Sequence, residues 1–140
     1  MSIKHPNMRP LEALVEYGHD KIERLRQPPQ EYYRHEFSAI GGFADRREEL
    51  TAHIRRVSLD NKEYLGRISL DTAVGGFSAA LTALNFYINP SVDINPDSLP
   101  HMSIIFGTLA ALFAADGISN LVIYARNWKY RAQCERELSE

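Results

Sequence analysis

The stretch that decides the fold runs from Ile68 to Ala125 and reads ISLDTAVGGFSAALTALNFYINPSVDINPDSLPHMSIIFGTLAALFAADGISNLVIYA. It contains none of the 16 lysine and arginine residues of the chain, although at their average frequency a window of this length would hold roughly six or seven. A bilayer explains the gap, because a cation at its centre costs roughly 2.5–3.5 kcal/mol on insertion scales. The stretch divides into two apolar runs, about Ile68–Ile88 and Met102–Ala125. We therefore predict an all-α protein with a transmembrane two-helix hairpin over residues 67–126.

Basic residues flank both ends of the hairpin, and the linker Asn89–His101 between the runs has none. They are Lys62 and Arg67 before it, and Arg126, Lys129 and Arg131 after it. Loops rich in lysine and arginine stay on the cytoplasmic side of a membrane. We therefore expect both termini in the cytoplasm or the matrix, in a bacterial inner membrane or a mitochondrial inner membrane.

Small and polar side chains recur along the first run at intervals of 4, 3, 4, 3 and 4 residues. They are Asp71, Gly75, Ser78, Thr82, Asn85 and Asn89. A mean spacing near 3.5 is the period of a left-handed helix–helix contact. In lipid, helices associate through close approach at small residues and through interhelical hydrogen bonds. We predict that these residues form a helix-packing seam. The opposite faces, suited to lipid or to a neighbouring subunit, hold Leu70, Val74, Phe77, Leu81, Leu84 and Ile88.

Four polar residues are expected inside the membrane: Asp71, Asp116, Ser119 and Asn120. In an antiparallel hairpin, Asp71 should lie level with Asn120, and Asp116 level with Gly75 or Gly76. An intramembrane carboxylate is a candidate functional group by default. Asp116 could line a proton or cation path. The alternative, which we favour, is that it holds the hairpin together or pairs with another subunit.

The region 1–66 is predicted to form two or three amphipathic helices on the cytoplasmic or matrix side. Pro10 suits the first turn of a helix, and Gln27-Pro28-Pro29 should end it. Its apolar residues fall on one face at intervals typical of a helix: Leu11, Leu14, Val15, Gly18, Ile22 and Leu25. This face either packs on the rest of the protein, which we favour, or docks on a partner or a membrane surface.

Two further helices are expected before the hairpin. Gln30–Ile40 could form a short helix ending at Gly41-Gly42. Asp45 is placed to cap the next one, with Glu48 three residues later as in a capping box. Ser58–Asn61 could end that helix or continue it, since Asp60 and Glu63 form a second possible capping box.

The composition and the motifs exclude several classes of protein. A net charge of −2 without a basic face argues against nucleic-acid partners. The single cysteine, Cys134, excludes an internal disulfide, and an unmodified thiol there is favoured over a palmitoylated one. Glu31 with His35 and Glu49 with His53 are helical pairs, but bundle dimetal sites use a shorter Glu-x-x-His spacing. No nucleotide-binding loop or nucleophile elbow is present. We expect no catalytic residues, no cofactor and no metal site.

The hairpin is followed by a basic and aromatic segment and a charged tail over 127–140. Arg126, Trp128, Lys129, Tyr130 and Arg131 are expected to anchor it at the membrane interface. Trp128-Lys-Tyr-Arg131, followed by Glu135 and Leu138, resembles the end of SLATT-type two-helix membrane proteins. The Trp-to-Tyr spacing here is one residue shorter than in that family. The resemblance covers the hairpin and tail and implies a pore-forming effector of a prokaryotic conflict system.

These observations lead to three functional hypotheses. The favoured one is a non-enzymatic integral membrane protein that acts as a small structural or assembly subunit of a larger inner-membrane complex. Its partners would be the lipid bilayer and other membrane subunits, or further copies of itself. The alternative is an oligomeric SLATT-like pore or cation channel with Asp71, Asp116 and Asn120 on the path. A third is a soluble helical interaction domain.

Overall fold

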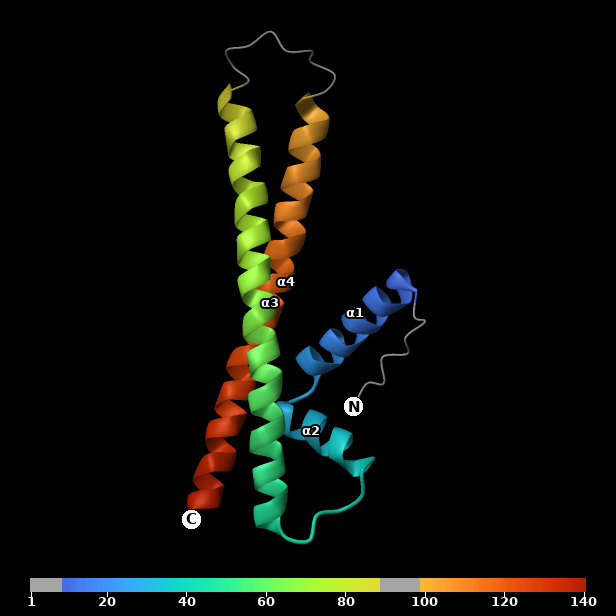
Figure 1. The fold of residues 1–140 in the computed structure, drawn as a ribbon, viewed down its shortest axis with the longest axis vertical. Coiled ribbons are helices and arrows are strands. Elements are labelled where there is room, and N and C mark those ends of the chain that lie inside the picture. The colour runs from blue at the N-terminus through green and yellow to red at the C-terminus, as the bar shows by residue number, and fades with distance from the viewer. Residues whose placement is uncertain (1–8, 89–98) are drawn as a thin grey trace. The chain divides into compact units, whose positions relative to one another are not determined.

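A computed structural model describes residues 9–88 and 99–140, and in these ranges the protein contains four helices and no strands (Figure 1). The predicted all-α class is therefore confirmed. The chain divides into two compact units. The head unit comprises the residues up to Asn61 together with Val122–Glu140, and the hairpin unit comprises Lys62–Leu121. Residues 122–140 thus fold with the N-terminal helices, a pairing that the sequence analysis did not predict.

Prolines delimit the first two helices as expected. Helix α1, Pro10–Arg26, begins with a proline in its first turn, where the missing N–H leaves no hydrogen bond unmade. It ends before Pro28, and helix α2, Pro29–Ser38, begins with the next proline. Gly41 follows with a φ of 97°, a left-handed conformation that glycine adopts without strain.

Helix α3 spans Arg46–Ile88 without interruption. Its start is capped as predicted, because the backbone N–H of Glu48 donates to the Asp45 carboxylate at 2.7 Å. The Glu48 carboxylate in turn accepts from the backbone N–H of Ala44 at 2.9 Å. Residues 58–61 continue the helix, so the expected third N-terminal helix is not separate from the first apolar run. Asp60 therefore caps nothing.

Helix α4 spans Leu99–Ser139 and begins three residues before the predicted Met102. Pro100 occupies the second position of the helix, where a proline is tolerated, so the Leu99-Pro100 pair does not delay its start. The expected boundary at His101 was wrong for this reason. The preceding part of the predicted linker, and Asn89 of the predicted seam, lie outside the described residues.

Within the described ranges, one helix is long and apolar enough to cross a membrane, the Ser103–Ser139 part of α4. This finding supports a membrane association on the basis of length and composition. The crossing by α3, the sidedness and the type of membrane stay predictions.

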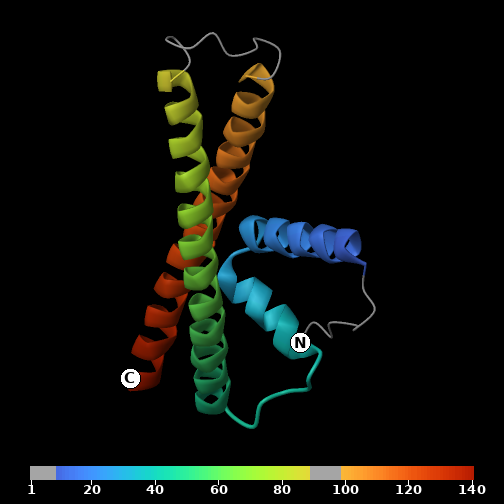
Figure 2. The same cartoon turned by 45° about the horizontal axis from the view of Figure 1, so that its top comes forward.

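The hairpin unit is an antiparallel pair formed by the C-terminal part of α3 and the N-terminal part of α4 (Figures 1 and 2). Asp71 contacts Asn120, and Gly75 contacts Phe113, so the two helices run in opposite directions. The Asn120 side chain reaches Asp71, but the residue level with Asp71 is Gly117, so the level predicted for Asp71 and Asn120 was wrong by about one turn. The prediction that Gly75 lies level with Asp116 was wrong by about one turn.

Candidate functional site

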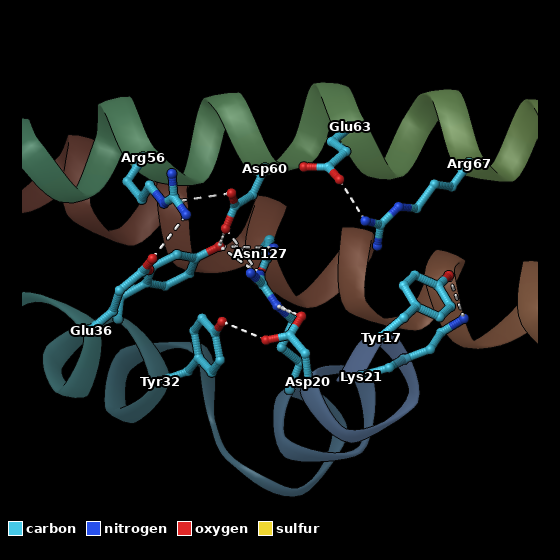
Figure 3. A network of polar contacts seen from close by, with 12 residues as sticks. Tyr17, Asp20, Lys21, Tyr32, Glu36, Arg56, Asp60, Glu63, Arg67 and Asn127 are labelled. Atoms are coloured by element: carbon cyan, nitrogen blue, oxygen red, sulfur yellow. Dashed lines mark hydrogen bonds and ion pairs between the residues drawn. The ribbon is translucent and has the colours of Figure 1, made fainter. Parts of the chain in front are cut away.

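The head unit is organised around a buried polar centre (Figure 3). The Asp60 carboxylate on α3 accepts a hydrogen bond from the Arg24 guanidinium of α1 at 3.0 Å. The same carboxylate oxygen accepts from the Tyr33 hydroxyl of α2 at 2.7 Å. The side chains of Arg24 and Asp60 are only 9% and 7% exposed, so the two charges stabilise each other, and Asp20 and Arg56 are their further partners. One carboxylate thereby joins α1 and α2 to α3.

Tyr33 connects this centre to α4. Its hydroxyl accepts a hydrogen bond from the Asn127 side-chain amide at 3.2 Å, and its ring stacks on Tyr130 with centroids 6.0 Å apart and planes 5° apart. Tyr33 is fully buried. Burial raises the pKa of its phenol strongly, and the neighbouring Asp60 raises the pKa further. Tyr33 therefore stays a neutral donor.

Arg126 ties α4 to the end of α1. Its guanidinium donates to the backbone carbonyls of Leu25 and Gln27, each at 2.8 Å. It also donates to the carbonyl of Arg24 at 3.4 Å. The last carbonyls of a helix have no partner within the helix, and a cation near them is favoured by the helix dipole. Arg126 thus caps α1 from a distant part of the sequence.

Two peripheral contacts brace the centre. Asp20 on α1 accepts from Arg24 at 3.1 Å and from the Tyr32 hydroxyl at 2.9 Å. On the other side, Arg56 of α3 donates to Glu36 of α2 at 2.8 Å. All these groups restrict α1 and α2 to one orientation against the head-unit segments of α3 and α4.

A second cluster of the head unit contains His53, Tyr130 and Cys134. His53 Nδ1 lies 2.6 Å from the Tyr130 hydroxyl, and its ring stacks on Phe37 with centroids 4.7 Å apart. Burial lowers the pKa of His53 and so favours the neutral ring. Cys134 is buried, and burial raises the pKa of its thiol. A buried thiol with a raised pKa is a poor nucleophile.

In the hairpin unit, one amide bridges two carboxylates. The side-chain amide of Asn120 donates to Asp71 at 2.8 Å across the helix pair and to Asp116 at 3.2 Å on its own helix. Ser119 instead donates to the backbone carbonyl of Asp116 at 2.8 Å. The predicted intramembrane polar residues are thus brought together, except for the Ser119 hydroxyl.

The predicted seam faces the partner helix over the part that the structure describes. Asp71 and Ser78 are buried, and Gly75, Thr82 and Asn85 are half-buried. A Cβ atom on Gly75 would lie 3.2 Å from the Cβ atom of Phe113. The two backbones therefore approach closely at this glycine.

The outer surface of the hairpin unit is apolar. Large hydrophobic side chains of the described residues that are at least half exposed are Leu65, Leu70, Phe77, Leu84, Tyr87, Ile104, Ile105, Leu112, Ile118 and Leu121. Two exposed hydroxyls on this surface are satisfied within their own helix, since Ser69 and Thr72 donate to the carbonyls of Leu65 and Ile68. The unit thus has polar groups inside and apolar groups outside, the reverse of a water-soluble helix pair.

The residues expected to anchor the membrane interface are used in different ways. Within the head unit, Arg126 bonds to the end of α1 and Tyr130 stacks on Tyr33 of α2. Arg131 pairs with Glu135 at 2.8 Å along α4. Lys129 is exposed, and Trp128 is 60% exposed.

The described residues contain no group of three or more histidine, cysteine, aspartate or glutamate side chains that could hold a metal ion. Comparison with protein-family models, with curated proteins and with solved structures finds no match to this chain.

The sequence analysis missed the polar centre of the head unit, although a signal for it exists. The seam spacing of α3 continues upstream through buried residues at intervals of three and four: Leu50, His53, Val57, Asp60 and Tyr64. Extending the seam in that direction would have predicted buried positions for His53 and Asp60. The partners on α1 and α2 could not be predicted from this spacing.

Proposed function

We propose that this chain is a small, non-enzymatic integral membrane protein that serves as a structural or assembly subunit of a larger membrane complex. The observation that carries the proposal is the reversed polarity of the hairpin unit. Its buried carboxylates and amide lie at the contact between the two helices, whereas Phe77 and many of its leucine and isoleucine side chains face outward.

A bilayer is the solvent in which this arrangement is stable. In water, exposing this many large apolar side chains would cost about 25 cal/mol for each Å². In lipid the same surface costs nothing, while interhelical hydrogen bonds and close glycine contacts hold the pair together. The soluble interaction domain is disfavoured by the same observation. Both termini would lie on the cytoplasmic or matrix side, because the basic residues flank the hairpin and leave its linker without any.

The head unit supports an assembly role more than an enzymatic one. Its buried polar groups bond mainly to one another and bind α1 and α2 to α3 and α4. Such a centre produces a defined surface next to a membrane anchor. It leaves the tyrosine neutral and the thiol protonated, so neither is activated as a nucleophile.

The test is purification of the tagged full chain from its native membranes in a mild detergent, followed by mass determination and flux measurement in liposomes. The assembly role predicts unrelated membrane subunits at fixed stoichiometry and no ion flux from the chain alone. A chain that purifies without other subunits contradicts this role.

A second candidate is the SLATT-like cation pore, favoured by the pair of carboxylates around Asn120. The buried Oδ1 of this amide has no hydrogen-bond partner within the described ranges, which leaves an acceptor near Asp71 and Asp116. The pore predicts cation flux in liposomes that is lost in Asp116→Asn. The matched control is Ser119→Ala, whose hydroxyl bonds only to its own helix.

A further inference from the structure

Helix α1 exposes its apolar face. The exposed fractions are 71% for Leu11, 64% for Leu14, 65% for Val15, 58% for Ile22 and 37% for Leu25. A surface helix of a water-soluble domain turns such a stripe toward the core. The expectation that this face packs on the rest of the protein was therefore wrong.

The face by which α1 is attached is polar. Asp20 and Arg24 point to the core, where they bond to Tyr32 and to Asp60. The Arg24 side chain is buried in that centre, so rotating α1 to hide its leucines would break this buried ion pair and leave the Asp60 carboxylate with only Arg56, at 3.6 Å. The polar contacts of α1 thus fix the orientation in which its apolar face is exposed.

The bonds of Arg126 indicate what covers this face. Arg126 is the first lysine or arginine after the gap that begins at Ile68, so it marks the level at which α4 would leave a bilayer. Its guanidinium holds the carbonyls of Leu25 and Gln27. The C-terminal end of α1 is therefore held at the level of the headgroups.

The charged residues of α1 are also distributed as expected for a helix at the depth of the lipid headgroups. Arg26 is exposed and stands one turn after Ile22, beside the apolar face, where its cation can reach lipid phosphates. Glu12 and Glu23 are exposed on the other side of the helix, away from the leucines. In Figures 1 and 2, α1 runs at an angle to the head-unit part of α3 and not alongside it. An amphipathic helix lying in the membrane plane has this distribution of residues.

We propose that α1 is an interfacial helix that lies on the lipid surface, with Leu11, Leu14, Val15 and Ile22 inserted at the boundary between headgroups and acyl chains. The inference rests on the proposed function, because the bilayer is the one that the hairpin unit crosses. α1 then fixes the depth and the tilt of the head unit at the membrane.

The test places single nitroxide labels on the full chain in vesicles of phosphatidylcholine with a minority of phosphatidylglycerol. The background is Cys134→Ala, and the labelled variants are Leu14→Cys on the apolar face and Glu23→Cys on the other side. Phe77→Cys, an exposed position of the hairpin unit, is the membrane reference. Collision with oxygen reports lipid, and collision with a water-soluble nickel chelate reports water. We expect oxygen to dominate severalfold at Leu14 and Phe77, and nickel to dominate at Glu23.

Each of the other outcomes refutes either the interfacial helix, the membrane hairpin or the lipid contact. Nickel dominance at Leu14 with oxygen dominance at Phe77 refutes the interfacial helix and leaves the membrane hairpin standing. Nickel dominance at Phe77 refutes the membrane hairpin itself. Low access of both reagents to Leu14 shows that protein covers this face, either a second copy or another subunit, and refutes the lipid contact.

A second variant tests how α1 is held. Arg126→Gln removes the guanidinium that bonds to the end of α1, and we expect the oxygen-to-nickel ratio at Leu14 to fall severalfold while the ratio at Phe77 stays unchanged. Arg131→Gln is the control, because Arg131 pairs only along α4 with Glu135. An unchanged ratio at Leu14 in Arg126→Gln refutes the positioning role of Arg126.

Discussion

Asp60 is the residue on which the head unit depends most, because two helices reach it through buried donors. Asp60→Ala leaves the buried Arg24 with only the partly exposed Asp20 as an anion, and breaking a buried ion pair typically costs about 3–5 kcal/mol. We expect the free energy of unfolding in detergent to fall by about that amount, measured by chemical unfolding with Trp128 fluorescence.

The control for this prediction is Glu135→Ala in the same unit, since the exposed pair of Glu135 with Arg131 should contribute only about 0–1 kcal/mol. Asp60→Asn keeps an acceptor for Tyr33 and should fall between the two. Equal stability of Asp60→Ala and Glu135→Ala would contradict the buried centre.

His53 makes the head unit sensitive to acid. Burial lowers the pKa of His53 below its ordinary 6.5, so the unfolded state binds the proton more readily than the folded state. The stability that the neutral ring contributes is therefore full above pH 6.5 and is lost as the pH falls below that value. We expect unfolding at pH 5.5 to need less denaturant than at pH 7, with a smaller difference in His53→Gln.

The matched control is His35→Gln, since His35 is exposed. This variant should keep the full difference between the two pH values. The account of His53 fails if His53→Gln and the unchanged protein lose the same stability on acidification. Arg46, Arg34 and Glu49 act on the same ring and are unchanged in both variants.

Gly75 shows why the seam on α3 requires a small residue. A leucine at this position must displace Phe113, whose Cβ atom already lies 3.2 Å from the position of a Cβ on residue 75. We expect Gly75→Leu to destabilise the hairpin by about 1–3 kcal/mol through overpacking, measured by unfolding in detergent.

Gly76→Leu is the control, because nothing lies within 4 Å of a Cβ atom at that position. Both variants replace one glycine by leucine in the same helix, so their difference isolates the contact with α4. A loss as large in Gly76→Leu as in Gly75→Leu would show that the seam is not the contact surface.

The helices were largely predictable from local signals, and their continuity was not. The prolines before α1 and α2 and the cap at Asp45 act within a few residues, so sequence patterns locate them. The continuity of α3 through residues 58–61 depends on packing of Val57 and Asp60 in the head unit. Tertiary contacts of this kind override a local stop signal such as the Asp60–Glu63 capping pattern.

The two candidate sites differ in how much of each could be predicted from the sequence. The seam from Asp71 follows from spacing alone, because a helix in lipid must gather its polar groups on one side. The bonds of Arg126 to α1 join residues about a hundred positions apart. No periodicity within one helix records such a pairing, so only the structure supplied it.

At the scale of the whole molecule, the proposed function divides between the two units, with the hairpin unit as the membrane anchor and the head unit as the part that binds other subunits. The hairpin unit carries the apolar surface, and the head unit carries a fixed set of helices bound by buried polar groups. α1 adds an apolar face whose position is fixed by Arg126. These features are the ones that the proposed role as a membrane-anchored assembly subunit requires.

The central claim is that the hairpin unit crosses a bilayer, and alkaline carbonate extraction of native membranes tests it most directly. Carbonate releases proteins that are bound only to the membrane surface, so a peripheral marker in the same sample is the control. The account predicts that the full chain sediments with the membranes, as the exposed leucine, isoleucine and phenylalanine side chains of the hairpin unit require. Release of the chain into the supernatant with the peripheral marker would contradict it.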